Sequence, residues 1–339
     1  MDKIDFVVPW VDSNDPAWVE SYNYYRQDKT ILDKVRFRNW GLFRYWFRAV
    51  EKYAPWVNKV FLITNGKFPD WINPECKKLV LIKHSDYIPD KYLPTFNSKT
   101  IELNLGRIKE LSEHFVYFND DIFINSPITP QHYFKEGLPC DYNFETVFRN
   151  PIYNKYNRFG FELDNLCDIS VINSHFNRMD TIRQAWKKWY GRHLWGKPIF
   201  FSILLFGRPW FENFAFSHLE NPILKSIFHE IWEEEEEFLD RSCSRFRDDA
   251  SLNQHLIRYW QFASNKFYPS KRYGLAYFTY SKEITDDLII NLKSEHCSSI
   301  CINDNPFICK EDLEYATSNI RTAFEEKFPQ ISIFEKKKT

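Results

Sequence analysis

The sequence lacks long hydrophobic runs and has no excess of charge of either sign. It contains no stretch of about 18 consecutive apolar residues, so we expect no transmembrane helix. The first residues, Met-Asp-Lys, lead directly into a strand pattern, so we also expect no signal peptide. The net charge of −1 provides no basic face of the kind that nucleic acids require, which excludes them as expected partners.

Cysteine is scarce, and repeats and low-complexity linkers are missing. The seven cysteines are scattered and odd in number, as is typical of reduced thiols in a cytoplasmic protein. His296, Cys297, Cys301 and Cys309 lie close in sequence, but their spacing matches no common zinc finger. The 339 residues suffice for a large core, and we expect one catalytic unit with an insertion.

Aromatic residues, in contrast, are abundant. They make up 19% of the chain, as 32 Phe, 19 Tyr and 12 Trp. Many of them are expected in the core, and exposed ones could stack on sugars or on a uracil ring.

Strand and helix patterns alternate in the first third of the chain. Apolar, β-branched runs predict strands at 4–11, 59–64, 79–83 and 115–118. Apolar residues at helical spacing predict helices at 32–53 and 98–114, the second with Ser98 as its N-cap. This order predicts an α/β fold with a mainly parallel sheet that is flanked by helices.

The regular alternation is lost near residue 127. Residues 127–215 are rich in aromatics and have a helical pattern near 177–190, which predicts an inserted, mostly helical subdomain. Residues 1–126 and 216–335 are then expected to form the N-terminal and C-terminal parts of one core. The C-terminal part has patterns typical of helices at 222–239, 248–262 and 310–328 and of a short strand at 277–280.

Asp120 and Asp121 directly follow a buried strand pattern. Two adjacent carboxylates at a strand end are unfavourable, through desolvation and mutual repulsion, unless a positive partner lies against them. A divalent cation carrying a diphosphate would be such a partner, since hard cations bind carboxylate and phosphate oxygens. Ligands of open α/β sheets bind beyond the carboxyl ends of the strands. A polar turn after a core strand would show the same residues.

The start of the helix predicted at 98–114 offers further candidates. Asn97, Ser98 and Glu102 could face the same pocket as the Asp pair, because this helix leads directly into the strand before it, and a helix N-terminus favours anions. Alternatively, Ser98 only caps the helix and Glu102 is a solvated charge in its first turn.

Trp10, Val11 and Asp12 end the first predicted strand. A nucleotide would lie beyond such a strand end, where Asp12 could accept a hydrogen bond from uracil or ribose. The alternative for these residues is a surface turn. Arg38 and Arg44 lie near the start of an otherwise apolar helix pattern and could bind phosphate oxygens, or else be solvated or paired with glutamates.

His218 and Lys225 precede and begin a predicted helix. A neutral histidine is the usual general base for a hydroxyl nucleophile, and Lys225 could neutralise phosphate charge, although a single histidine is often only a packed or surface residue. Arg245 and Arg247 stand before the next predicted helix, as either a phosphate clamp or part of an ion-pair cluster.

The segment 301–305 is rich in side-chain oxygens. Asp304 and Asn305 could supply a metal ligand from the C-terminal part of the chain. The run Asn-Asp-Asn-Pro is also a plain turn signal.

Four blocks of motifs, in this order along nearly the whole chain, resemble the Stealth family of sugar-phosphate transferases. That family includes bacterial capsule and surface-polysaccharide phosphotransferases and the catalytic subunit of the lysosomal-enzyme N-acetylglucosamine-1-phosphotransferase. Two departures are Ser13, where the family usually has Gly, and Asn39, where it usually has Asp. The matching residues are 4–15, 36–39, 93–98, 101–102, 117–121, His218, Pro222, Lys225, Glu230, Trp232, 245–247, Asp249, Tyr259, 301–305, 328–329 and 334–335.

The resemblance implies a glycosyltransferase-A-like core and a UDP-sugar donor that is attacked at the phosphorus next to the sugar, with UMP as leaving group. It also implies a catalytic set of Glu102, Asp121, His218 and Arg245. In this set His218 is the candidate base, and Arg245, together with Lys225, stabilises the phosphoryl charge. Asp121 with Asp304 or Asn305 would hold Mg²⁺ or Mn²⁺.

The resemblance further implies a bacterial polysaccharide role with an oligosaccharide acceptor, which we expect to be lipid-linked. A cytoplasmic enzyme associated with the inner face of the cell membrane, through peripheral contact, would fit such an acceptor. Two alternatives stay open: a glycosyltransferase that moves only the sugar and releases UDP, and a non-catalytic carbohydrate-binding protein that uses its aromatic residues.

Overall fold

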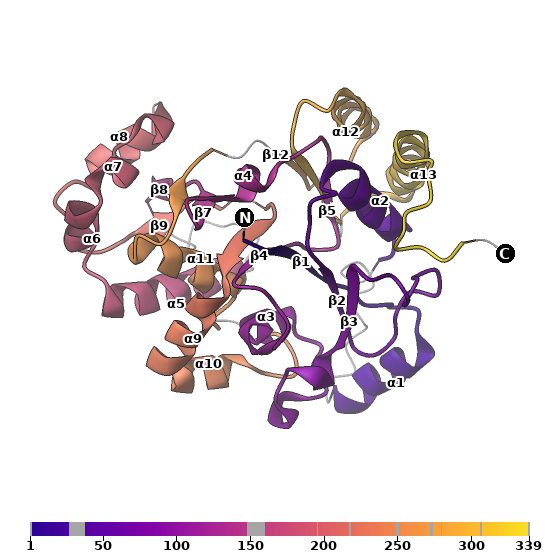
Figure 1. Ribbon diagram of the computed structural model, residues 1–339, viewed down its shortest axis with the longest axis horizontal. Coiled ribbons are helices and arrows are strands. Elements are labelled where there is room, and N and C mark those ends of the chain that lie inside the picture. Colours follow the sequence, from indigo (N-terminus) through magenta and orange to yellow (C-terminus); the bar gives the residue numbers. More distant parts are fainter. Residues whose placement is uncertain are drawn as a thin grey trace.

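The computed structural model describes residues 2–26, 38–147, 160–194, 196–216, 218–248, 251–271, 274–278, 280–305 and 307–337 (Figure 1). Part of the helix predicted at 32–53 lies outside these ranges, as do the motif residues 36–37 and Asp249. No helix in the described part of the chain is long and apolar enough to cross a membrane.

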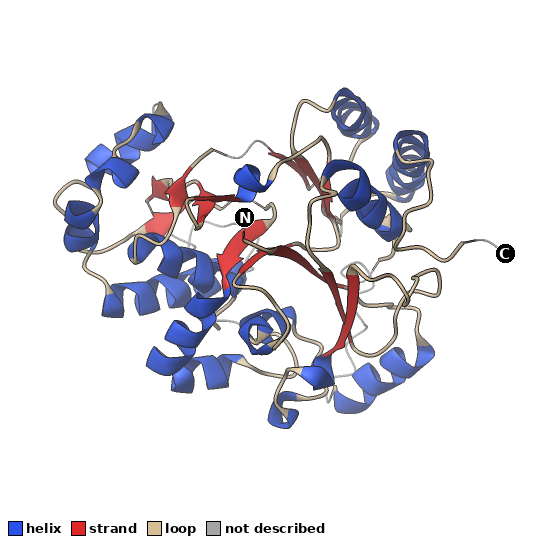
Figure 2. Cartoon of the chain, viewed as in Figure 1, coloured by secondary structure: helices blue, strands red, loops and turns tan. Residues whose placement is uncertain are grey.

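A five-stranded sheet forms the centre of the fold (Figure 2). Its three inner pairings, β3–β2, β2–β1 and β1–β4, are parallel, and the edge strand β10 runs antiparallel to β4. β2 is buried along its whole length, as expected for the apolar run of a strand that is covered on both faces. The α/β class with a mainly parallel sheet is therefore confirmed. In spatial order the strands are β3 (Leu79–Lys83), β2 (Val60–Thr64), β1 (Ile4–Pro9), β4 (His114–Tyr117) and β10 (Asn221–Leu224).

Helices cover both sides of this sheet. The helix α2 (Phe43–Tyr53) buries its apolar stripe, including Trp46, Phe47 and Val50, in the common core. The helices α12 (Lys282–Ser294) and α13 (Lys310–Lys327) pack together on the same side as α2, whereas α3 (Ser98–Leu103), α9 (Lys225–Glu234) and α10 (Glu236–Ser242) lie on the other side (Figure 1).

A second, smaller sheet joins the C-terminal part of the chain to the loop after β4. β13 (Ser299–Ile302) pairs in parallel with β12 (Gly274–Tyr277) and antiparallel with β5 (Ile122–Ile124). In the second pairing Cys301 lies opposite Ile122, so the residues after Cys301 run toward Asp121.

The segment predicted as an insertion forms a helical lobe at the left of Figure 1. The helices predicted near 177–190 are present as α6 and α7. α5 packs against α11 of the C-terminal part. The domain boundaries at 127 and 215 stay a prediction. The lobe contains β8 (Glu145–Thr146), α5 (Gly160–His175), α6 (Arg178–Gln184), α7 (Trp186–Trp189), α8 (Lys197–Leu204) and β9 (Asn213–Phe214).

Several predicted boundaries were wrong. The segment 222–239 begins as the strand β10, and its Pro222 is tolerated because β10 is an edge strand. The helix predicted at 98–114 ends at Leu103. A tight turn follows, in which Gly106 lies against Phe228 so closely that an added Cβ would be 2.4 Å from the Phe228 Cβ. The N-cap of α3 is Asn97 and not the predicted Ser98. The Asn97 side chain accepts a hydrogen bond from the Lys99 N–H.

The remaining elements were either unexpected or shifted. The helix α1 follows an Asp15 cap and Pro16, a signal that we interpreted only as a turn. The helix expected at 248–262 starts at Gln254 behind an Asn253 cap. These elements are α1 (Pro16–Tyr25), α4 (Pro130–Tyr133), β6 (Phe134–Lys135), β7 (Leu138–Asp141), α11 (Gln254–Ala263) and β11 (Tyr268–Pro269).

Candidate active site

A pocket of about 1010 Å³ lies beyond the carboxyl ends of β1 and β4. Its wall includes Trp10 after β1, Glu102 of α3 and the loop between β4 and β5 that carries Asp120 and Asp121. This is the edge of an α/β sheet at which ligands bind.

Two antiparallel pairings bring distant segments to the Asp pair. Asn221 of β10 lies opposite Tyr117 of β4, so the chain just before Asn221 runs beside the residues that follow Tyr117. This places His218 near Asp121. The pairing of β13 with β5 places Asn303 and Asp304 there from the other side.

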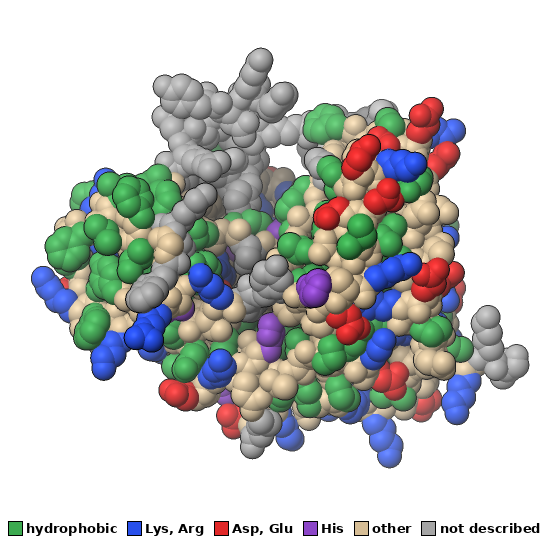
Figure 3. All heavy atoms as spheres, turned by 90° about the horizontal axis from the view of Figure 1, so that it is seen from above, with side chains coloured by type: hydrophobic (Ala, Val, Ile, Leu, Met, Phe, Trp, Pro, Cys, Tyr) green, Lys and Arg blue, Asp and Glu red, His purple; other side chains and the backbone are tan. Residues whose placement is uncertain are grey.

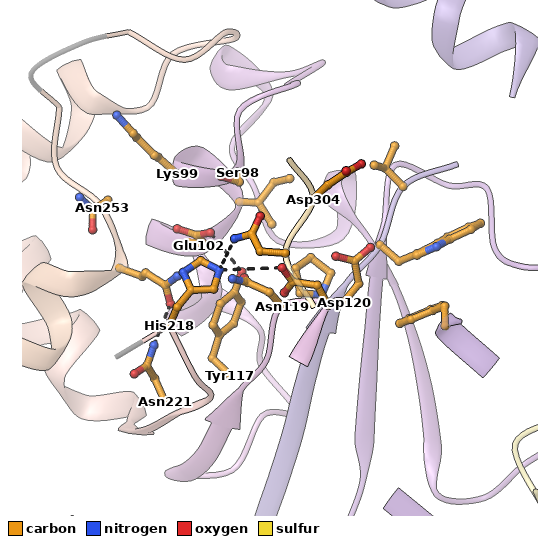
Figure 4. Close-up of a pocket in the computed structure, with 18 of the residues that line it drawn as sticks. Ser98, Lys99, Glu102, Tyr117, Asn119, Asp120, His218, Asn221, Asn253 and Asp304 are labelled. Atoms are coloured by element: carbon orange, nitrogen blue, oxygen red, sulfur yellow. Dashed lines mark hydrogen bonds and ion pairs between the residues drawn. The ribbon is translucent and has the colours of Figure 1, made fainter. Parts of the chain in front are cut away.

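Asp121, His218 and Asn303 all line this pocket. Figure 4 shows His218 in it, with Asp120 and Asp304. The Nδ2 of Asn303 lies 3.0 Å from the Nε2 of His218, and an amide N–H can only donate, so Nε2 accepts in this arrangement. The same Nε2 lies 3.8 Å from the Oδ2 of Asp121. A proton on Nε2 would therefore face a carboxylate that can stabilise it.

The two adjacent aspartates are electrostatically unfavourable, as the sequence indicated. Desolvation by the surrounding protein raises the pKa of Asp120 to about 7, and the negative charge of Asp121 adds to this effect. The side chain of Asp120 is nevertheless open to the pocket. The Oδ1 of Asp121 is buried and has no hydrogen-bond partner among the residues that the structure describes. Both features indicate carboxylates that are suited to binding a cation.

Glu102 is the third unusual carboxyl of the pocket. Burial raises its pKa to about 7, and the charge of Arg247 and a hydrogen bond from the Tyr117 hydroxyl, at 3.1 Å, only partly oppose this effect. Near neutral pH, Glu102 can therefore hold or release a proton.

The pocket wall is acidic overall. This is unexpected for a site that binds a diphosphate, unless a cation binds there first. Among the described residues that line it, the carboxylates are Glu102, Asp120, Asp121, Asp164 and Asp304, and the Lys and Arg residues are Arg38, Lys99 and Arg247.

The geometry at Asp121 fits a hard divalent cation. Ligand atoms of Asp121, His218 and Cys301 lie within 4.8 Å of one another. Burial and the neighbouring Asp121 raise the pKa of the Cys301 thiol well above its usual value, so Cys301 does not offer a thiolate. The carboxylate of Asp121 would then be the principal ligand of such an ion, and an oxygen donor of this kind suits Mg²⁺ or Mn²⁺.

Most of the residues predicted for the site line this pocket. Asp304 is one of them, and its Oδ1 forms an ion pair with the guanidinium of Arg38 at 3.0 Å. Arg247 is another, and it contacts the hydroxyl of Ser98. The predicted residues along the pocket wall are Trp10, Val11, Arg38, Ser98, Glu102, Asp120, Asp121, His218, Arg247 and Asp304.

Two predicted phosphate ligands do not line the pocket. The ammonium of Lys225 donates to the carbonyl oxygens of Ile108, Lys109 and Leu111, at 2.7, 3.3 and 3.2 Å. The guanidinium of Arg245 donates instead to the carbonyls of Leu93 and Pro94, and it lies 4.2 Å from the centre of the Tyr25 ring. These placements do not support the predicted phosphate contacts, because the donors already hold backbone carbonyls.

Four other predicted residues also lie outside the pocket wall. Asn97 is buried and holds the 244–246 segment, and Asn305 accepts from the Phe307 N–H in a turn. Asp12 accepts from the Asn14 N–H in the turn before α1, and Arg44 lies over the Trp71 ring. Their placement supports local structural roles and not substrate contact.

The sequence analysis missed several pocket residues. Asn119 and Asn303 lie within the segments 117–121 and 301–305 that the sequence singled out, but no role was predicted for them. The buried ion pair of Lys99 and Asp164, at 2.7 Å, joins separate parts of the chain and leaves no local signal. The other polar residues missed are His84, Tyr117, Asn221, Asn253 and His255.

Comparison with known proteins identifies relatives of this chain. Residues 36–140 match the model of conserved region 2 of Stealth proteins. The chain is 39% identical over 344 residues to a capsular polysaccharide phosphotransferase, WcwK, of Streptococcus pneumoniae, covering 99% of this chain and 100% of the relative. It is 35% identical over 340 residues to the exopolysaccharide phosphotransferase cps2G of Lactiplantibacillus plantarum, covering 98% and 96%.

A solved structure of galactosyltransferase LgtC, in complex with donor and acceptor sugar analogues, is similar over 95% of both chains, with 8% identity and a TM-score of 0.41. The fold class rests on the sheet topology. The topology and pocket define an α/β protein with an acidic site beyond the carboxyl ends of a mainly parallel sheet. The full-length identity and the matched conserved region show that the chain belongs to the Stealth family of bacterial polysaccharide phosphotransferases.

Proposed function

We propose that this enzyme transfers a hexose-1-phosphate from a UDP-sugar to a hydroxyl group of a glycan acceptor in the synthesis of a bacterial capsular or surface polysaccharide. The observation that carries the proposal is the meeting of Asp121, His218 and Asn303 at the carboxyl end of β4, in a chain whose full-length relatives bear the name of polysaccharide phosphotransferases. The products would be a sugar phosphodiester and UMP.

The acidic pocket supports a requirement for Mg²⁺ or Mn²⁺. A divalent cation would offset the negative charge of the carboxylates and of the donor diphosphate, and would polarise a phosphoryl oxygen. Asp121 is the expected principal ligand, because its Oδ1 is buried without a hydrogen-bond partner among the described residues. Asp120 and Asp304 lie in the same wall and are expected to add oxygens or to bind its waters.

His218 is the expected general base. In the reaction its Nε2 takes the proton of the acceptor hydroxyl while the hydroxyl oxygen bonds to the phosphorus next to the sugar. The bond from that phosphorus to the bridging oxygen of UMP breaks, and UMP leaves with the electron pair. Asn303 donates to Nε2 of the neutral imidazole until the acceptor hydroxyl displaces it, and Asp121 stabilises the imidazolium once it forms.

The donor is expected to lie between Trp10 and the basic residues of the wall. Trp10 stacks on Phe43 with parallel rings, 5.8 Å between centres, which gives a flat apolar surface for a uracil. Arg38 and Arg247 line the wall and are expected to contact the phosphate oxygens.

The acceptor is expected on the His218 side. The rings of Phe216 and Phe278 lie 5.3 and 5.4 Å from the imidazole centre, and both side chains are partly exposed. Aromatic faces of this kind suit the apolar face of a sugar. The acceptor would be a lipid-linked oligosaccharide at the inner face of the membrane.

A doubly labelled donor tests this proposal. UDP-sugar with ³²P in the phosphate next to the sugar and ³H in the sugar is incubated with enzyme, Mn²⁺ and a lipid-linked glycan fraction. Transfer of both labels to the glycan in equal amounts, with release of unlabelled UMP, is the expected result. Transfer of ³H alone, with ³²P remaining in UDP, would overturn the proposal in favour of simple glycosyl transfer.

A further inference from the structure

An exposed apolar surface on the helical lobe has no role in the reaction proposed above. We call it the basic-apolar face. Its apolar members are large and at least half exposed, and exposed basic residues lie in the same helices and loops. The face comprises Trp186, Phe200, Ile203, Leu204, Phe206 and Trp210, with Arg183, Lys187 and Arg192.

The helix α8 presents this apolar surface to solvent by its spacing. Phe200, Ile203 and Leu204 follow one another at positions i, i+3 and i+4, so they share one helix face, and they are 64%, 62% and 53% exposed. Ser202 and Leu205 on the opposite side are buried against the lobe. A helix that turns its apolar face outward exposes surface that is normally covered by a partner.

The same segment is strongly basic in a nearly neutral protein. Its residues 178–210 include seven basic side chains and one acidic one, Asp180, although the whole chain has a net charge of −1. In Figure 3 hydrophobic side chains gather on the lobe at the left, with Lys and Arg at their border. The basic residues are Arg178, Arg183, Lys187, Lys188, Arg192, Lys197 and Arg208. Of these, Arg178 is buried in an ion pair with Glu145 and Arg208 pairs with Glu212, whereas Arg183, Lys187 and Arg192 are exposed.

This charge selects among the partners that could cover the face. A second copy of the chain would bring an equally basic segment, and the two would repel each other. An anionic lipid bilayer offers both an apolar interior for the Phe, Ile and Leu side chains and negative headgroups for the Lys and Arg side chains. Tryptophans such as Trp186 and Trp210 are typical of residues at the headgroup level.

We propose that the basic-apolar face docks on the surface of an anionic phospholipid bilayer, with the apolar side of α8 inserted among the headgroups. This binding does not depend on the proposed reaction. Because the chain runs from this lobe through β9 directly to Phe216 and His218 in the pocket wall, docking would hold the acceptor side of the site near the bilayer.

Vesicle co-sedimentation of the full chain, without donor or acceptor, tests the proposal. Vesicles of phosphatidylglycerol and phosphatidylcholine are compared with vesicles of phosphatidylcholine alone. We expect binding to the anionic vesicles that weakens with salt and is at least about tenfold weaker on neutral ones. Phe200→Ser with Ile203→Ser and Leu204→Ser should weaken binding to anionic vesicles by about tenfold or more, and so should Arg183→Glu with Lys187→Glu.

Matched controls are available outside the face. Ile290 of α12 is 64% exposed, like Ile203, so Ile290→Ser should leave binding unchanged; Lys77→Glu serves in the same way for charge. Equal binding to both kinds of vesicle, or no binding, would overturn the proposal. So would a wild-type dimer in light scattering that the α8 variant converts to a monomer, because the face would then be covered by a second copy.

Discussion

Two groups of carboxylates in this protein have opposite surroundings. In the lobe and its junction with the core, two buried carboxylates are matched by arginines: Glu145 is bound by Arg178 at 2.6 and 2.9 Å, and Asp141 by Arg258 at 2.7 and 3.2 Å. At the end of β4, by contrast, the Oδ1 of Asp121 has no hydrogen-bond partner among the described residues, and the pKa of Asp120 is raised.

The difference separates carboxylates that stabilise the fold from those expected to bind a ligand. A fully paired carboxylate is satisfied by the protein itself, and it has no further use for a cation. Asp120 and Asp121 have no such arginine partner among the described residues, and a cation from outside would offset their charge. If this interpretation is right, changes at the two places should affect different quantities, namely activity at the pocket and stability at the arginine pairs.

Asp121→Asn should produce the largest effect. It keeps the shape of the side chain but removes the expected principal ligand of the cation and the partner of the protonated His218. We expect the rate of UMP formation to fall by about 10³-fold or more, which corresponds to about 4 kcal/mol.

The melting temperature of this variant should stay the same or rise, because an unfavourable charge is removed. The matched control is Asp70→Asn, whose side chain is 90% exposed, and which should change neither quantity. An Asp121→Asn enzyme with normal activity would contradict the site assignment.

Arg178→Met should act in the opposite way. It leaves the buried Glu145 without its bidentate partner, so the free energy of unfolding should fall by about 3–5 kcal/mol in urea denaturation. Arg183→Met, on the same helix, removes only an exposed pair with Asp180 and should cost less than about 1 kcal/mol. Equal losses in the two variants would show that pairing in the lobe does not determine stability.

Glu102→Gln should stabilise the protein at alkaline pH. A carboxyl whose pKa is raised from about 4.5 to about 7 binds more protons in the folded state, so the wild type loses stability as the pH rises through this window. The variant lacks this loss and should be more stable by about 3 kcal/mol at pH 8.

The advantage of Glu102→Gln should shrink as the pH falls toward 5, in denaturation curves recorded at several pH values. Glu20→Gln, at an exposed position of α1, is the control and should show no pH-dependent difference. The compared quantity is the stability of Glu102→Gln minus that of the wild type. A smaller difference at pH 8 than at pH 5 would contradict the raised pKa.

The pH dependence of the reaction should show the smallest effect. A proton on Asp120, whose pKa is about 7, competes with the cation, so activity at limiting Mn²⁺ should fall by up to about tenfold for each pH unit below 7. A higher Mn²⁺ concentration should move this limb of the profile to lower pH. A limb that does not move with Mn²⁺ would contradict its assignment to Asp120.

Much of the fold could be predicted from the sequence, because the signals for it are local. The apolar runs of β1, β2, β3 and β4 and the helical stripe of α2 are visible in short windows. Boundaries that depend on distant contacts could not be predicted. α3 ends early where Gly106 meets Phe228, and Pro222 lies in a strand because β10 borders the sheet at its edge.

The candidate site divides in the same way. The Asp pair was predicted because two adjacent carboxylates after a buried strand are a local anomaly, whereas the contact of Asn303 with His218 depends on two antiparallel pairings. The order of motifs along the chain did not predict the contacts of Lys225 and Arg245. Their charged groups donate to backbone carbonyls and do not line the pocket.

Calorimetric titration of Mn²⁺ tests the central claim most directly. It would be carried out at pH 6.5, in two buffers of different ionisation enthalpy, on the wild type and on Asp121→Asn. The account predicts that the wild type binds one ion and releases protons, because the cation displaces them from carboxyls such as Asp120, and that Asp121→Asn binds at least about tenfold more weakly. Equal affinity of the two proteins, or binding of Mn²⁺ without proton release, would contradict it.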